Sequence, residues 1–223
     1  MSEIRLLLAD DDALMRAGVR AILAADPHLR VVAEAADGDQ AVERALHHRP
    51  DLALLDVRMP GTDGLTAARR IRSLLPATAI VVLTLFGQDE NIDAALDIGV
   101  DGFVLKTGDP ADLLTGLRAA AAGAAFLSPP VVRRILARHY GPRTRRRDLD
   151  RERAAALTPR ERQVLALLGR GETDRDIARL LGVAPSTVKT HLDSLRTRLG
   201  VHGRVHLALL AHRAGLTDHP PAP

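Results

Sequence analysis

Short apolar runs alternate with amphipathic stretches through the first half of the chain. The apolar runs lie at Ile4–Ala9, Val31–Ala36, Leu52–Leu55, Ala79–Leu83 and Phe103–Leu105. The amphipathic stretches lie at Leu14–Ala25, Gln40–His47, Leu65–Leu75, Ile92–Ile98 and Leu113–Ala122. Strict alternation of strands and helices favours parallel strands that are covered by helices on both faces. The pattern therefore predicts an α/β domain, a doubly wound five-stranded parallel sheet, over residues 1–125.

From Leu157 onwards the pattern is all-helical, and its helix ends are marked by capping residues. Thr158, Pro159 and Glu161 predict an N-cap, a proline at the first helical position and a capping box. Three further helices are expected, from Thr173 to Gly182, over Pro185–Leu199 and over Arg204–Ala214, with glycines at their ends. An all-α domain of four helices is predicted for residues 156–216.

The segment between these two domains has prolines, a Gly-Pro pair and the basic run Arg143–Arg147. Broken periodicity and charge repulsion are typical of a linker. Residues 126–155 are therefore predicted to be a linker with a helical turn around Val131–His139, and the Pro-rich residues 217–223 a disordered tail.

Charge divides the chain in the same way. Residues 1–125 have 12 basic and 19 acidic side chains, whereas residues 126–223 have 19 basic and 9 acidic ones. The net charges are −7 and +10, and the basic half favours a polyanion partner over the alternative of a solvated arginine-rich face. The chain has no cysteine, which excludes disulfides and thiolate chemistry. It also shows no signal peptide and no membrane-spanning run, so a cytoplasmic protein is expected.

Acidic side chains follow two of the predicted strands. Asp10 and Asp11 end the first strand and Asp56 ends the third. Because the carboxyl ends of parallel strands lie at one edge, these carboxylates should converge there, where Mg²⁺ would relieve their repulsion. Thr84 and Lys106 end the fourth and fifth strands, so the set predicts a phosphoryl-transfer site with Asp56 as the acceptor. Asp12 is expected to cap the next helix instead.

At these positions the chain resembles the receiver domain of two-component response regulators. The motifs are "LLADDD", "LLDVRMPGTDG", "VVLT" and "GFVLK", in order over about residues 3 to 123. The resemblance implies a flavodoxin-like fold in which Asp10 and Asp11 are the acidic pair and Asp56 is the phosphoacceptor. It further implies that Asp11, Asp56 and the Arg58 carbonyl bind Mg²⁺, and that Thr84 and Lys106 contact the phosphoryl oxygens. Thr84 and Phe103 would form the switch, although Phe103 lacks the hydroxyl of the tyrosine that relatives often have there.

The second and third helices of the basic half form a helix-turn-helix pattern, with the third as the reading helix. The stretch "LTPRERQVLALLGRGETDRDIARLLGVAPSTVKTHLDSLRTRLGV" resembles the LuxR-type output domain of the NarL/FixJ group. The resemblance implies that Lys189, Thr190 and Asp193 face DNA and that His191 and Arg196 lie near its backbone.

Several residues of this domain keep two interpretations. Asp193 would accept a hydrogen bond from a cytosine or, as we favour, orient a neighbouring arginine. Arg196, Arg198 and Arg204 are either phosphate contacts or solvated charges. Ala184 stands where relatives usually have a capping serine, so the reading helix is expected to lack a side-chain cap.

Together these features predict a transcriptional response regulator that is not a turnover enzyme. A sensor histidine kinase would phosphorylate Asp56, and a homodimer would bind double-stranded operator DNA, with RNA polymerase considered as a further partner. Two alternatives stay open: a metal-dependent phosphohydrolase that forms an aspartyl-phosphate, and an orphan regulator that binds DNA without phosphorylation.

Overall fold

The first domain contains one parallel β-sheet. The computed structural model describes residues 3–84, 89–128, 131–132 and 144–217. The strands are β1 (Ile4–Ala9), β2 (Leu29–Ala35), β3 (Leu52–Asp56), β4 (Ala79–Thr84), β5 (Gly102–Leu105) and β6 (Phe126–Leu127). Their order is β2-β1-β3-β4-β5-β6, and every neighbouring pair is parallel. The five predicted strands are confirmed, and a short sixth is added.

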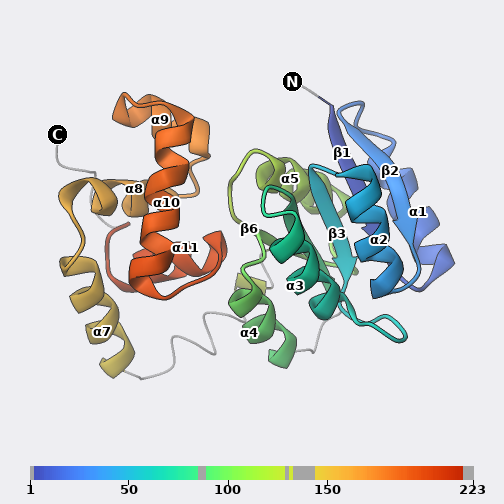
Figure 1. The fold of residues 1–223 in the computed structure, drawn as a ribbon, viewed down its shortest axis with the longest axis horizontal. Helices are drawn as coiled ribbons and strands as arrows, with labels where there is room; N and C mark the ends of the chain where they lie inside the picture. Colours follow the sequence, from blue (N-terminus) through green and yellow to red (C-terminus); the bar gives the residue numbers. More distant parts are fainter. Residues whose placement is uncertain (1–2, 85–88, 129–130, 133–143, 218–223) are drawn as a thin grey trace.

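Helices cover both faces of this sheet (Figure 1). They are α1 (Ala13–Leu23), α2 (Gly38–His48), α3 (Gly64–Leu74), α4 (Asp89–Ile98) and α5 (Pro110–Ala121). Helices α1 and α5 contact each other, while α2, α3 and α4 pack in succession. The doubly wound α/β architecture predicted from the sequence is therefore confirmed.

Both faces of the central strands are buried. In β1, Leu6 and Leu8 belong to one hydrophobic cluster, whereas Leu7 belongs to the cluster on the opposite face. In β3, Leu52 and Leu54 belong to the same cluster as Leu6, and Leu55 belongs to the same cluster as Leu7. Because successive side chains of a strand point to opposite faces, a strand buried on both faces must be apolar throughout. Burial of each leucine stabilises the fold by about 1.5–3 kcal/mol.

The second domain is all-helical. It contains α7 (Thr144–Ala155), α8 (Pro159–Gly169), α9 (Asp174–Leu181), α10 (Pro185–Leu199) and α11 (Arg204–Arg213). Helices α8 to α11 confirm the four predicted helices, and their buried leucines and valines form one core. Helix α7 lies in the segment predicted to be a linker, and a buried ion pair of 2.6 Å between Asp150 and Arg213 joins it to α11.

Two of the predicted features lie largely outside the described residues. Of the helical turn expected around residues 131–139, the structure describes Val131 and Val132, which are helical. Of the tail at 217–223, it describes Thr217. Among the described residues, none of the helices combines the length and the apolar character that a membrane span requires.

Helix α11 links the two domains. It contacts α4, and Val205 of α11 belongs to the same buried cluster as Ile92 and Ala95 of α4. The backbones of Gly99 and Gly203 also meet, because a Cβ atom at Gly203 would lie 2.5 Å from the Gly99 Cα. The domains therefore touch through an apolar contact and a close backbone approach.

Candidate functional site

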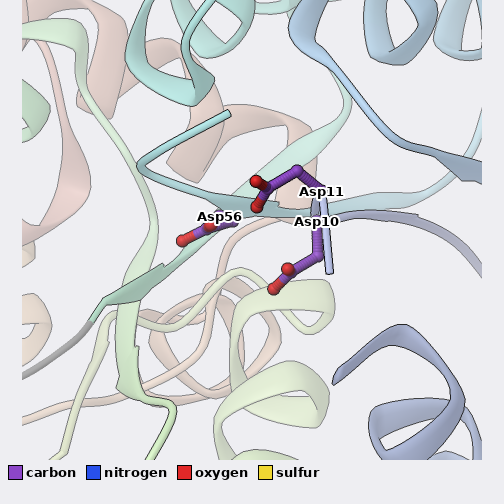
Figure 2. Close-up of side chains that lie close together, drawn as sticks. All are labelled: Asp10, Asp11 and Asp56. Atoms are coloured by element: carbon purple, nitrogen blue, oxygen red, sulfur yellow. The ribbon is translucent and has the colours of Figure 1, made fainter. Parts of the chain in front are cut away.

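Three carboxylates converge at the carboxyl edge of the sheet (Figure 2). Asp10, Asp11 and Asp56 each place one carboxylate oxygen within 4.8 Å of the others. Asp10 and Asp56 are buried, whereas Asp11 is exposed. Hard carboxylate oxygens with one side open to water are the donor set that Mg²⁺ prefers. The residues present therefore fit a magnesium ion, as their positions at the strand ends predicted.

Lys106 lies between two of these carboxylates. Its Nζ atom is 2.7 Å from Asp10 Oδ2 and 2.9 Å from Asp56 Oδ2, and its side chain is 8% exposed. Burial alone would lower the pKa of Lys106, but the hydrogen bonds to Asp10 and Asp56 outweigh burial and raise the pKa. The ammonium form therefore persists at neutral pH, and its charge offsets the repulsion between the two carboxylates.

Burial raises the pKa of the Asp56 carboxyl, and the neighbouring charge of Asp10 adds to this shift. Lys106 and a backbone hydrogen bond from Arg58 oppose it. A desolvated carboxylate beside a fixed ammonium is a suitable acceptor for a phosphoryl group, because the positive charge is already in place for the phosphoryl oxygens.

Thr84 and Phe103 lie on the adjoining strands. Thr84 is the buried last residue of β4, and its carbonyl accepts a hydrogen bond of 2.9 Å from the Lys106 backbone N–H. Phe103 of β5 pairs with Val82 in the sheet and is 1% exposed. The fold thus brings Thr84 to the same edge as Asp56 and Lys106, while the Phe103 ring lies in the core.

The loop after β3 depends on Gly64, the first residue of α3, for which the sequence suggests only a turn beside the capping Asp63. A Cβ atom at Gly64 would lie 1.7 Å from the Asp56 carbonyl oxygen, and the Gly64 N–H donates to the Val57 carbonyl at 3.0 Å. Glycine is required here for this close approach rather than for a turn. In the sequence, Gly64 ends the motif "LLDVRMPGTDG", but its Asp-Gly pair is also common in ordinary turns.

The loop after β1 is also tied to the following helix. Asp12 accepts hydrogen bonds from the Leu14 and Met15 backbone N–H groups, which confirms it as the N-cap of α1. Arg16 of α1 donates to the carbonyls of Asp10 and Asp11. Sequence reasoning missed Arg16, since no local motif marks a side chain that binds backbone carbonyls.

In the second domain, α9 and α10 form the helix-turn-helix. Gly182 ends α9 with φ 64°, and α10 begins at Pro185 after Ala184, which makes no side-chain cap as predicted. Lys189, Thr190 and Asp193 are exposed on α10, while His191 and Arg196 are half-buried. Asp193 Oδ1 lies 2.7 Å from Arg196 Nη1, the arrangement that the orienting interpretation of Asp193 requires.

Arg204 corrects one expectation. It is 3% exposed, forms an ion pair with Asp174 and donates to the Glu172 carbonyl at 2.7 Å. Arg204 is therefore neither a phosphate contact nor a solvated charge, but a residue that fixes the start of α11 against the loop before α9. Arg198 lies on the surface and pairs with Glu161 at 2.7 Å.

Comparison with known proteins agrees with both halves of this geometry. Residues 6–118 match the model of the response regulator receiver domain, and residues 155–211 match that of the luxR family of bacterial regulatory proteins. The nitrate/nitrite response regulator protein NarL of Escherichia coli is 37% identical over 93% of this chain and 94% of its own. The transcriptional regulatory protein LiaR of Bacillus subtilis is 35% identical over 96% of this chain and 100% of its own.

A solved structure gives the same result. The RcsB response regulator of Salmonella typhimurium is 28% identical over 95% of this chain and 99% of its own, with a TM-score of 0.57. These relatives are regulators rather than turnover enzymes, which sets aside the phosphohydrolase alternative. The chain belongs to the two-component response regulators and joins a receiver domain to a LuxR-type DNA-binding domain.

Proposed function

We propose that a sensor histidine kinase phosphorylates Asp56 and that this modification controls the binding of α10 to operator DNA. The observation that carries the proposal is the position of the buried Asp56 carboxylate, 2.9 Å from the Lys106 ammonium and beside Asp10 and Asp11. Of the three carboxylates, Asp56 ends its strand without an acidic neighbour in the sequence. Asp10 and Asp11 are adjacent and remain as a pair for metal binding.

The transfer step is a substitution at phosphorus. An Asp56 carboxylate oxygen attacks the phosphorus of a phosphohistidine, the P–N bond breaks, and the imidazole nitrogen leaves with the electron pair. Lys106 and Thr84 lie at the same edge of the sheet, and their ammonium and hydroxyl groups would stabilise charge on the phosphoryl oxygens. Asp10, Asp11, Asp56 and the Arg58 carbonyl would hold Mg²⁺, which neutralises further charge on these oxygens when bound.

The switch would follow from the position of the new group. Phosphorylated Asp56 would draw the Thr84 hydroxyl at the end of β4, and the packing around Phe103 on β5 would then change. Phe103 is buried and has no hydroxyl, so its contribution rests on shape rather than on hydrogen bonding.

For the output, we infer that a homodimer places two copies of α10 in successive major grooves, with half-sites about one helical turn apart. Lys189, Thr190 and Asp193 are the exposed residues that would face the bases, while His191 and Arg196 would lie near the DNA backbone. RNA polymerase would be a further partner at the promoter.

Phosphorylation of the full chain by acetyl phosphate and MgCl₂ tests the acceptor. Intact-mass measurement should show the addition of one phosphoryl group to the wild type and none to Asp56→Asn. Removal of Mg²⁺ with a chelator should abolish the addition.

Asp63→Asn is the matched control, because it makes the same chemical change in the neighbouring loop. Asp63 caps α3 by accepting from Thr66 N at 2.7 Å, and asparagine caps a helix as well as aspartate does. The control should be labelled like the wild type. Undiminished labelling of Asp56→Asn would show that another residue is the acceptor.

A further inference from the structure

We propose that Arg16 is a positioning residue of the acidic site, which holds the loop that carries Asp10 and Asp11 in the geometry that binds Mg²⁺. This role rests on the proposed magnesium site. Arg16 itself does not bind the metal or the phosphoryl group; it acts through the backbone of the two residues that do.

One guanidinium nitrogen binds two consecutive carbonyls. Arg16 Nη1 donates to the Asp10 carbonyl at 2.6 Å and to the Asp11 carbonyl at 3.2 Å. Consecutive carbonyls of an extended strand point in opposite directions, so both reach one nitrogen only where the chain has turned out of the strand. The contact thus fixes the peptide group between Asp10 and Asp11, and with it the directions of the two side chains.

The other side of this loop is held by Asp12. The Asp12 backbone N–H donates to Asp10 Oδ1 at 3.0 Å, and the Asp12 side chain caps α1. The Arg16 backbone N–H donates to the Asp12 carbonyl at 3.0 Å, so the guanidinium group reaches back from the first turns of the helix over the loop. Loop and helix are therefore one hydrogen-bonded unit, in which Arg16 makes the contacts to the carbonyls of the two metal-binding residues.

Glu34 of β2 holds the Arg16 side chain in place. Glu34 Oε2 is 3.6 Å from Arg16 Nε, and Glu34 Oε1 is 3.0 Å from Arg20 Nη1. The Arg16 side chain is 19% exposed and that of Arg20 is 59% exposed, so the first pair is less screened by water.

Two effects of Arg16 on Mg²⁺ binding oppose each other. Its positive charge repels a cation, whereas its hydrogen bonds preorganise the ligands. The Glu34 carboxylate beside the guanidinium offsets part of this repulsion, although it also pairs with Arg20. The hydrogen bonds act directly on the backbone of Asp10 and Asp11, so we expect preorganisation to dominate and loss of Arg16 to weaken Mg²⁺ binding.

Isothermal titration of MgCl₂ into the full chain measures this directly. Arg16→Gln should raise the Kd for Mg²⁺ about tenfold, the usual scale for losing a group that orients metal ligands. Arg16→Lys should restore part of the affinity, since an ammonium group can donate to both carbonyls but lacks the Nε contact to Glu34. Arg20→Gln is the matched control: it loses an arginine from the same Glu34 but none from the loop, and its Kd should equal that of the wild type.

A second readout separates positioning from a loss of folded protein. With acetyl phosphate as donor, the Mg²⁺ concentration for half-maximal phosphorylation of Arg16→Gln should rise about tenfold, with an unchanged rate at saturation. A merely destabilised variant would lose amplitude without a shift in this concentration.

Three results would overturn the proposal. The first is an unchanged Kd for Mg²⁺ in Arg16→Gln, and the second is an equal rise of this Kd in Arg20→Gln. The third is a lower amplitude of phosphorylation in Arg16→Gln without a change in the Mg²⁺ concentration for half-maximal phosphorylation. A wild type that takes up the phosphoryl group but binds no Mg²⁺ would overturn the metal site and this role together, yet leave the acceptor Asp56 standing.

Discussion

Gly64 packs directly on the backbone of Asp56, where a larger residue has no space. The atom that a Cβ would meet is the Asp56 carbonyl oxygen at 1.7 Å, and a backbone atom cannot move aside as a long side chain could. The start of α3 is thereby pressed against the end of β3, which sets the position of the Asp56 side chain. Gly64 carries no charge, but it belongs to the acidic site because it packs on the backbone of Asp56.

We therefore expect Gly64→Ala to displace Asp56. Phosphorylation by acetyl phosphate should fall, and the free energy of unfolding should decrease by about 1–3 kcal/mol, as is usual for overpacking. The control is Gly18→Ala, because a Cβ at Gly18 in the exposed face of α1 meets nothing within 4 Å. That variant should be about 0.5–1 kcal/mol more stable than the wild type. If Gly64→Ala matched the wild type in both urea unfolding and phosphorylation, the close approach would be irrelevant to the site.

Some residues of the site could be predicted from the sequence, whereas others could not, for a physical reason. The sequence predicted that Asp10, Asp56 and Lys106 lie close together, because the carboxyl ends of parallel strands lie at one edge of the sheet. Arg16 and Gly64 were missed, because they act on backbone atoms whose positions depend on the fold. Arg204 was misinterpreted, because its burial depends on the distant Asp174.

At the scale of elements, Glu161 ties two helices of the output domain together. It completes the predicted capping box of α8, in which Thr158 N donates to Glu161 Oε2 at 3.0 Å. The same carboxylate accepts from Ser194 Oγ at 2.9 Å and from Arg198 Nη1 at 2.7 Å, both on α10. Hydrogen bonding, first from the Thr158 backbone, lowers the pKa of Glu161 to about 2.

This pKa predicts an acid-dependent loss of stability. A carboxyl with a folded-state pKa below its ordinary value of 4.5 stabilises the fold above that pH. The contribution is lost as the pH falls from about 4.5 towards about 2. Between about pH 6 and about pH 3 the wild type should lose more stability than Glu161→Gln, measured by urea unfolding of the full chain.

At neutral pH, Glu161→Gln itself should cost about 1–3 kcal/mol, because it weakens hydrogen bonds to a charged acceptor. Glu152→Gln on the exposed face of α7 is the control and should follow the wild type at every pH. Parallel pH profiles for wild type and Glu161→Gln would show that this carboxylate does not couple α8 to α10.

Helices α8 to α10, whose ends carry caps or terminal glycines, were predicted well, whereas β6 and α7 were not predicted. Thr158, Thr173, Gly182 and Gly200 marked the ends of α8 to α10 correctly, since each satisfies backbone groups locally. The two-residue strand β6 is too short for a periodic signal. Helix α7 has the sequence "TRRRDLDRERAA", and the contact that joins it to α11 is a buried ion pair rather than an apolar stripe.

At the scale of the whole molecule, the receiver contacts the output domain through α11 and leaves the reading helix accessible. Lys189, Thr190 and Asp193 of α10 are exposed in this arrangement. On the receiver side, Arg72 holds the loop between α4 and β5 by donating to the Gly99 carbonyl at 3.0 Å and pairing with Asp101 at 2.5 Å. Because Gly99 in this loop contacts Gly203, a shift of the loop would also displace Gly203.

We expect one added methyl group to open the contact between the domains. Gly203 has φ −130°, which alanine adopts without backbone strain, so Gly203→Ala tests chiefly the approach to Gly99, with a smaller effect at the N-cap of α11. Small-angle X-ray scattering of the full chain should show a larger radius of gyration for this variant than for wild type or Gly18→Ala. An unchanged scattering curve would mean that the two domains are not held together by this contact in solution.

If modification of Asp56 controls DNA binding, as proposed, the affinity of the full chain for DNA must depend on phosphorylation, and measuring this affinity is the most direct test. Genome-wide capture supplies the duplex, and its Kd is then measured with and without acetyl phosphate and MgCl₂. Phosphorylation should tighten binding by the wild type about tenfold, within the usual range of coupling between two sites. Asp56→Asn should show the same Kd under both conditions. If the wild type had the same affinity for DNA with and without the phosphodonor, phosphorylation would not regulate DNA binding. The protein would then be an orphan DNA-binding regulator.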